Sequence, residues 1–178
     1  MSSIKIRQCG ITDGNTECIV NAANVNLKGC GGVCGAVFRG AGWDDMEAIC
    51  DEIGHCDVGA AVITPALRLR TKYVIHAVGP VWQGGGFHED KLLYSAYRAA
   101  LDLALAYGLH SVSLPLISVG NNGYPIEDAW TIGLRACADF LDDHPAYEID
   151  LLFTIPDETL VRVGNFQLSR MFSRAKAQ

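Results

Sequence analysis

The sequence has 178 residues, of which 49% are hydrophobic and 19% charged, a composition that excludes a disordered chain. Its net charge of −6 argues against a broad basic surface for nucleic acid, so any phosphate group is expected to be bound locally by loops. No apolar leader and no run long enough to cross a bilayer is recognisable. We expect one domain over residues 1–178, located in the cytoplasm, with the nucleus as the alternative.

The chain contains seven cysteines, an odd number, and without a leader peptide we expect free thiols rather than a disulfide framework. Some of them raise the question of zinc, namely Cys30, Cys34, Cys50 and Cys56 together with His55. However, the chain has no C-x-x-C pair, and these spacings match no common structural zinc site. Small buried hydrophobic side chains are therefore expected at these positions, with no metal and no cofactor.

In the first half of the chain, short apolar runs alternate with segments of helical periodicity. The runs predict strands at residues 4–7, 17–21, 60–64 and 73–78, and the periodicity predicts helices from Gly35 onward and over residues 43–53. Residues 83–88 include three consecutive glycines and are expected to form a flexible surface loop.

The second half continues the alternation. Helices are predicted at residues 89–107, from Pro125 onward and at 157–172, and strands at residues 111–118 and 148–155. Gly108 is expected to end the first of these helices, and Pro115 to make its strand irregular because proline cannot donate to a ladder. Alternating elements whose strands are apolar on both faces predict a three-layer α/β/α sandwich with a mixed, mostly parallel central sheet.

Two glycine-rich segments each follow a strand and lead into a helix. One runs from Asn21 to Gly35 and the other from Ser118 to Pro125. Glycine weakens a core, but its bare backbone lets N–H groups approach an anion closely, helped by the positive end of the following helix. Because ligands of such sheets bind beyond the carboxyl ends of strands, the two segments are expected to share one cleft and to clamp a diphosphate. The simpler alternative is that both are turns that reverse the chain.

Three stretches of the sequence resemble the macrodomain family. Ile19-Val20-Asn21-Ala22-Ala23-Asn24, with Gly31-Gly32-Val33 behind it, resembles the first binding loop of that family. Residues 74–80 and 118–125 resemble its central strand and its second loop, in the same order along the chain. The resemblance runs from Ile4 to the final helix. It implies an α/β/α domain that binds ADP-ribose and, in many members, an enzyme that removes ADP-ribose from proteins or deacetylates O-acetyl-ADP-ribose.

By matching position, the resemblance also implies the site. Asn24 would hold the distal ribose and help to orient an attacking water, the alternative being a loop amide that caps local backbone. Asn21 is expected to be mainly structural, and His76 to be a hydrogen-bonded core residue. The implied ligand-binding residues are Gly10, Ile11, Asn21, Ala22, Asn24, Gly31, Gly32, Val33, Cys34, Ser118, Val119, Gly120, Asn121, Asn122, Gly123, Tyr124 and Ile155.

The sequence departs from the family pattern next to the first loop. Active members commonly carry Asp after Gly-Gly-Val and His soon after it, whereas this chain has Cys34 and Phe38. A thiol is mostly neutral at pH 7, so the Asp-based route to an activated water is absent, as it also is in some viral-type macrodomains. Cys34 stands beside Asn24 as a catalytic candidate, a nucleophile activated by a helix N-terminus, with a small buried hydrophobic residue as the alternative.

Further departures concern the two ends of the ligand. Gly10-Ile11 replaces the usual Gly-Asp-Ile of the adenine end, and Asp13 could substitute for that Asp only with a shifted loop. Ile155 stands where an aromatic residue often packs on adenine, and Asn122 where one commonly flanks the distal ribose. Each lost stacking contact would cost about 1 kcal/mol, so we expect a change in affinity or in the preferred ligand.

The sequence therefore predicts a protein that binds ADP-ribose or a closely related nucleotide, with an ADP-ribosylated protein as partner and no membrane contact. Hydrolysis of mono-ADP-ribosyl or O-acetyl-ADP-ribose esters by an activated water is the associated reaction. The first alternative is a non-catalytic reader of ADP-ribose or another nucleotide. A third hypothesis is a degenerate domain retained for protein contacts.

Overall fold

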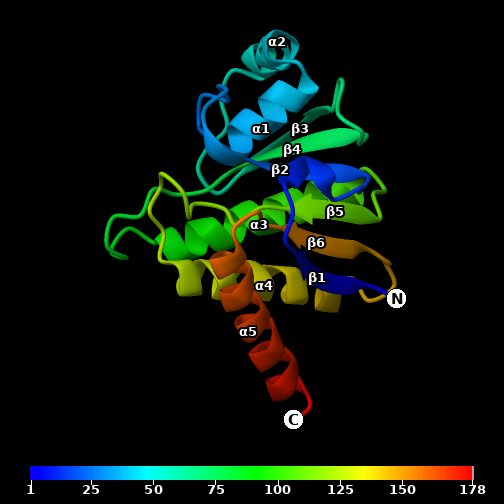
Figure 1. Cartoon of the computed structure of the whole chain (residues 1–178), viewed down its shortest axis with the longest axis vertical. Helices are drawn as coiled ribbons and strands as arrows, with labels where there is room; N and C mark the ends of the chain where they lie inside the picture. The colour runs from blue at the N-terminus through cyan, green and yellow to red at the C-terminus, as the bar shows by residue number, and fades with distance from the viewer. Residues whose placement is uncertain (178) are drawn as a thin grey trace.

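The computed structural model describes residues 1–177 and contains a six-stranded mixed sheet with helices on both faces (Figure 1). The strands are β1 (Ser3–Arg7), β2 (Cys18–Ala23), β3 (Ala61–Pro65), β4 (Tyr73–Val78), β5 (Ser111–Leu114) and β6 (Asp150–Thr154). Their order across the sheet is β1-β6-β5-β2-β4-β3. All neighbours pair in parallel except β3, the edge strand, which runs antiparallel to β4.

Within residues 1–177 five α-helices and one 3-10 turn surround the sheet. They are η1 (Ile11–Asp13), α1 (Gly32–Ala41), α2 (Trp43–Ile53), α3 (Glu89–Ala106), α4 (Ile126–Asp143) and α5 (Glu158–Ala175). The helices α1 and α2 cover one face, α3 and α4 cover the other, and α5 packs on α4 (Figure 1). This layering confirms the predicted α/β/α sandwich. None of the described helices has both the length and the apolar character needed to span a bilayer.

Two separate apolar clusters hold the three layers together. Along β2, Ile19 belongs to the cluster under α1 and α2, whereas Val20 belongs to the cluster under α3 and α4. Along β4, Val74 belongs to the cluster under α1 and α2, and Ile75 to the cluster under α3 and α4. Because side chains alternate between the faces of a strand, both faces of the central strands are buried, and the strands read as continuous apolar runs.

The predicted strand at residues 111–118 is only partly correct, because β5 ends at Leu114. Beyond Leu114 the backbone is hydrogen-bonded to the hydroxyl of Tyr97 in place of a neighbouring strand. This hydroxyl donates to the carbonyl of Pro115 and accepts the N–H of Ile117, each at 2.9 Å. The buried backbone next to the proline is thereby hydrogen-bonded without a neighbouring strand.

One other boundary differs from the prediction and one agrees with it. The first helix begins at Gly32, not at Gly35, so part of the expected loop is its first turn. Residues 83–88 form the predicted surface loop, and three of its N–H groups donate to the carboxylate of Glu89. At the end of α3, Gly108 has a φ of +66° and closes a Schellman motif, as the N–H of Leu109 donates to Ala104 at 2.9 Å.

Candidate functional site

The carboxyl ends of the parallel strands lie along one edge of the sheet because these strands all point the same way. The neighbouring strands β2 and β5 lead into the two glycine-rich segments. We call residues 24–31 the first loop and residues 118–124 the second loop. The ends of β1 and β6 bring Ile11 and Ile155 to the same edge. The residues that the sequence groups into one cleft thus emerge from adjacent strands.

Asn24 is fixed by the backbone of its own loop. Its Nδ2 donates to the carbonyl of Lys28 at 2.8 Å, and its Oδ1 accepts the N–H of Lys28 at 3.1 Å. The local capping role given above as the alternative is therefore present. An amide offers two N–H donors and two acceptor lone pairs, so one lone pair remains, and the second N–H donates to the sulfur of Cys30, a weak acceptor, at 3.8 Å. Asn24 is held in place with one acceptor lone pair to spare and one N–H that only sulfur accepts.

The N-terminus of α1 supplies unpaired backbone N–H groups beside the first loop. Gly31 is the N-cap, and the first bond within the helix runs from the N–H of Gly35 to the carbonyl of Gly31 at 3.2 Å. The N–H groups of Gly32, Val33 and Cys34 precede that bond and have no partner within the helix. Together with the helix dipole they favour an anion at this point.

Four glycines of this region border open space. A Cβ added to Gly31, Gly32, Gly120 or Gly123 would meet no protein atom within 4 Å. Gly32 and Gly123 have positive φ angles of +61° and +69°, which accounts for glycine there. Gly31 has a φ of −81°, which any residue adopts, and Gly120 has no positive φ either. Neither the backbone nor the packing of the chain explains glycine at these last two positions.

The second loop is closed by its own backbone. The N–H of Tyr124 donates to the carbonyl of Ser118 at 2.9 Å, and the N–H of Gly123 donates to Gly120 at 3.1 Å. Ser118 has a φ of +69°, an unusual conformation for a residue other than glycine, and its buried Oγ lacks a hydrogen-bond partner within residues 1–177. Strain and an unpaired hydroxyl therefore coincide at the start of this loop.

Asn21 and His76 form a buried polar pair beneath the first loop. The Asn21 Nδ2 lies 3.1 Å from His76 Nδ1, and Thr64 Oγ1 lies 3.0 Å from His76 Nε2. Because an amide nitrogen only donates, Nδ1 accepts and Nε2 carries the proton. Burial lowers the pKa of His76 to about 4, so the ring is neutral at pH 7. The expectation of a core histidine is confirmed, and Asn21 is fully buried in the sheet.

A family model described as Macro domain matches residues 20–133 of the chain. The chain belongs to the macro domain family. The "Macro domain-containing protein TTE0995" of Caldanaerobacter subterraneus subsp. tengcongensis is 44% identical over 149 residues, 82% of this chain and 85% of that protein. The O-acetyl-ADP-ribose deacetylase of Salmonella gallinarum is 42% identical over 91% of this chain and 92% of its own. The Oceanobacillus iheyensis macrodomain with ADP superposes with a TM-score of 0.88 at 32% identity, covering 95% and 91% of the two chains.

Cys34 of this macro domain is a buried neutral thiol. Its side chain is only 2% exposed and donates to the carbonyl of Lys28 at 3.5 Å. Burial, followed by the neighbouring Cys30, raises the pKa of Cys34 to about 12. The position of Cys34 in the first turn of α1 does not offset that burial, so its environment is that of a small hydrophobic residue and not of a thiolate nucleophile.

The adenine end of the predicted site is built by β1 and β6. The N–H of Ile155 donates to the carbonyl of Arg7 at 3.1 Å, which ties the two strand ends together. Ile11 and Ile155 are both buried. Asp13 accepts the N–H of Gly10 at 3.2 Å and so caps η1. The carboxylate considered above as a substitute for the family Asp is thus already engaged with the backbone.

The remaining predicted residues differ in exposure. Asn121 is exposed, Val119 and Asn122 are half-buried, and Ala22 lies inside β2. Tyr124 is buried with its ring centroid 4.9 Å from that of Trp82. Sequence reasoning missed Trp82, whose backbone N–H donates to the backbone carbonyl of Asn122 at 2.8 Å. Only its place four residues after the end of β4 could have indicated it.

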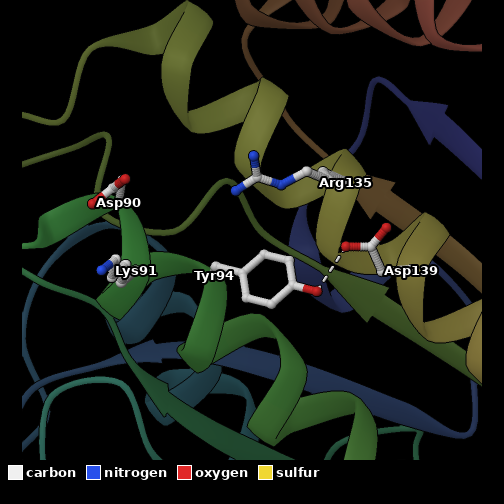
Figure 2. A pocket seen from close by; sticks show the side chains of 5 residues that line it. All are labelled: Asp90, Lys91, Tyr94, Arg135 and Asp139. Atoms are coloured by element: carbon white, nitrogen blue, oxygen red, sulfur yellow. Dashed lines mark hydrogen bonds between the residues drawn. The ribbon is translucent and has the colours of Figure 1, made fainter.

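A separate hollow of about 330 Å³ lies between α3 and α4 (Figure 2). The hydroxyl of Tyr94 donates to Asp139 at 2.7 Å, and the guanidinium of Arg135 lies 5.3 Å from the centroid of the Tyr94 ring. Asp90 and Lys91 complete the lining. Charges of both signs alternate here, so the hollow favours no single class of ligand.

The seven cysteines are free thiols in the structure. Among the described residues, no three His, Cys, Asp or Glu side chains come together in a way that could hold a metal ion.

Proposed function

We propose that this macro domain binds ADP-ribose across the carboxyl edge of the sheet, with the diphosphate between the N-terminus of α1 and the second loop. The observation that carries the proposal is the pair Gly31 and Gly120. Neither has a backbone conformation that requires glycine, and a side chain on either would enter open space. A ligand that approaches the backbone closely supplies the missing reason for glycine at both positions.

The comparisons support the choice of ligand. The Oceanobacillus iheyensis structure contains ADP, and the Salmonella gallinarum relative is named for O-acetyl-ADP-ribose. Both alignments include nearly the whole of this chain. ADP-ribose and proteins that carry it are therefore the proposed partners, and residues 1–178 are proposed to act as one domain.

The test of binding is substitution of Gly31 and Gly120 by valine, one at a time. Each side chain should fill the ligand space without meeting protein, so the melting temperature should stay near that of the wild type. The affinity for ADP-ribose, measured by calorimetry, should fall by more than about tenfold. Wild-type affinity in both variants would overturn the proposed ligand position, and no heat from the wild type itself would overturn ADP-ribose as the ligand.

We propose ester hydrolysis as the reaction at this site. In O-acetyl-ADP-ribose, water would add to the acetyl carbonyl and the ribose oxygen would leave, giving acetate and ADP-ribose. Asn24 supports this step, because its spare lone pair and the N–H that only sulfur accepts could orient the water and a ribose hydroxyl while Lys28 holds the amide still. The α1 N-terminus would stabilise negative charge on the ligand. Cys34 would take no chemical part, since it is neutral.

The test of turnover is the release of acetate from O-acetyl-ADP-ribose by the wild type and by an Asn24→Ala variant. Loss of the oriented water should lower kcat by about 100-fold or more. Because Asn24 also closes the first loop, the melting temperature of the variant must be recorded beside its rate. Equal release by both proteins would remove Asn24 from the reaction.

A non-catalytic reader is the second candidate function. Its specific support is the absence of a carboxylate after Gly31-Gly32-Val33, where Cys34 carries no charge. A reader would bind ADP-ribose in calorimetry and release neither acetate from O-acetyl-ADP-ribose nor ADP-ribose from a mono-ADP-ribosylated protein. Turnover above that of the Asn24→Ala variant would rule the reader out.

A further inference from the structure

Glu89, the first residue of α3, has a buried carboxylate that binds a loop. The residue is only 1% exposed. Its Oε1 accepts the N–H of Phe87 at 2.6 Å, and its Oε2 accepts the N–H groups of Gly85 at 2.8 Å and Gln83 at 3.1 Å. Burial alone would raise the pKa of Glu89, but these backbone hydrogen bonds lower it overall, so the carboxylate is ionised at neutral pH. Three N–H groups of one loop therefore converge on one charge.

The loop that Glu89 holds lies against Trp82. A Cβ on Gly85 would come within 3.1 Å of Cη2 of the Trp82 ring, so that ring packs on the backbone of Gly85. The centroid of the same ring lies 4.9 Å from that of the Tyr124 ring, and the backbone N–H of Trp82 donates to the backbone carbonyl of Asn122 at 2.8 Å. Trp82 thus joins the loop around Glu89 to the second loop.

A second contact links the same two regions. A Cβ on Gly79 would lie 2.2 Å from Ser118 Oγ and 2.4 Å from Ile117 Cγ2, so the chain leaving β4 runs directly against the start of the second loop. On its other side the second loop borders open space at Gly120 and Gly123. Besides its own short hydrogen bonds and the anchoring of Tyr124 and Val119 in the apolar cluster, the second loop is therefore supported from the side of residues 79–87.

We propose that Glu89 is a positioning residue for the second loop. Through residues 83–87 and Trp82, its carboxylate holds residues 118–124 in the shape that receives the ligand. The inference rests on the proposed function, because that function assigns the second loop to the diphosphate. A loop ordered before the ligand arrives lowers the entropy cost of binding, so a side chain without ligand contact controls affinity.

The main test is a Glu89→Gln variant. Glutamine keeps the size of the side chain but loses the charge, and its NH₂ group faces N–H donors to which it cannot bond. We expect the affinity for ADP-ribose to fall about tenfold. Hydrogen exchange should accelerate at the amides of residues 82–87 and also at Gly123 and Tyr124. The matched control is Asp102→Asn, which removes an exposed carboxylate near the other end of α3; the Asp102 side chain makes no hydrogen bond within residues 1–177, and its loss should leave both measurements unchanged.

Exchange that accelerates only at residues 83–87, with unchanged affinity, would overturn the proposal. If Glu89→Gln fails to fold, Trp82→Phe carries the test, because it keeps the backbone N–H and the buried charge while shrinking the ring between Gly85 and Tyr124. For Trp82→Phe we expect faster hydrogen exchange at residues 123–124 and weaker binding of ADP-ribose. Exchange rates and an affinity equal to those of the wild type would overturn the proposal. If the wild type itself does not bind ADP-ribose, the proposed function fails, whereas the exchange data still decide whether Glu89 orders the second loop.

Discussion

His76 illustrates how burial decides the chemistry of a residue. Its type suggests acid–base catalysis, but its ring lies in the core between Asn21 and Thr64, with no exposed surface. The low pKa of about 4 keeps the ring uncharged, so it accepts from Asn21 and cannot serve as an acid at neutral pH. Its role is to hold the strand that leads into the first loop. Cys34 follows the same principle, with a thiol kept protonated by burial.

The pKa of His76 predicts a dependence of stability on pH. The unfolded chain binds a proton near pH 6.5 and the folded chain only near pH 4, so the free energy of unfolding should fall as the pH decreases between these values. The full effect is about 3 kcal/mol. Urea unfolding of the wild type and of a His76→Gln variant, compared from pH 7 to pH 4, measures it. The variant should lose less stability over this range, and parallel curves would contradict the assigned pKa.

At the scale of elements, the sequence predicted most of the fold correctly where apolar periodicity is regular. The bounds of β4 and α2 agree with the prediction, because both have uninterrupted patterns. The second half of the strand predicted at residues 111–118 was wrong, since the hydroxyl of Tyr97 takes the place of a partner strand. That contact joins residues far apart in the sequence, and no local pattern indicates it.

The position of the two loops that form the proposed site was predictable to a similar degree. Its loops follow from the glycines and from the strand ends, which are local features. Capping of local backbone by the Asn24 side chain was weighed as an alternative, but the contacts of Glu89 were not foreseen. An acidic residue at the start of a helix usually interacts with the helix dipole in water, and only the fold shows that this one is buried under a loop.

The two hydrogen bonds of the Tyr97 hydroxyl give a prediction about the stability of the fold. A Tyr97→Phe variant should leave the carbonyl of Pro115 and the N–H of Ile117 without partners in a buried place, lowering the free energy of unfolding by about 2–4 kcal/mol. The control is Tyr107→Phe, because Tyr107 is exposed and its hydroxyl makes no hydrogen bond within residues 1–177. Chemical denaturation measures both. Equal stability of the two variants would mean that these hydrogen bonds contribute nothing.

At the scale of the whole molecule, α5 is attached mainly through α4. The Nε1 of Trp130 donates to the carbonyl of Leu160 at 2.9 Å, and a Cβ on Gly164 would lie 2.5 Å from Cζ2 of the Trp130 ring. Gly164 is thus the point at which the backbone of α5 touches the indole. Apolar side chains of α5 such as Leu160, Leu168 and Met171 add to this contact, so that α5 lies against α4 (Figure 1).

This close approach reverses the usual effect of a glycine substitution. In an exposed helix, Gly→Ala adds roughly 1 kcal/mol of stability, but Gly164→Ala should destabilise by about 1–3 kcal/mol because the methyl group meets the rigid Trp130 ring. Asn165→Ala, at the next and exposed position, should be neutral or slightly stabilising. Thermal unfolding of both variants gives the comparison, and a higher melting temperature for Gly164→Ala would refute the contact.

The two hydrogen bonds between Asn24 and Lys28 also have a kinetic meaning. These bonds within the protein hold the side chain in one orientation, so its loss of freedom belongs to folding and not to binding. A nucleotide that binds as proposed above would meet a preformed surface at Asn24 and would need no slow rearrangement of the first loop. Association should accordingly follow a single exponential whose rate rises linearly with ligand concentration.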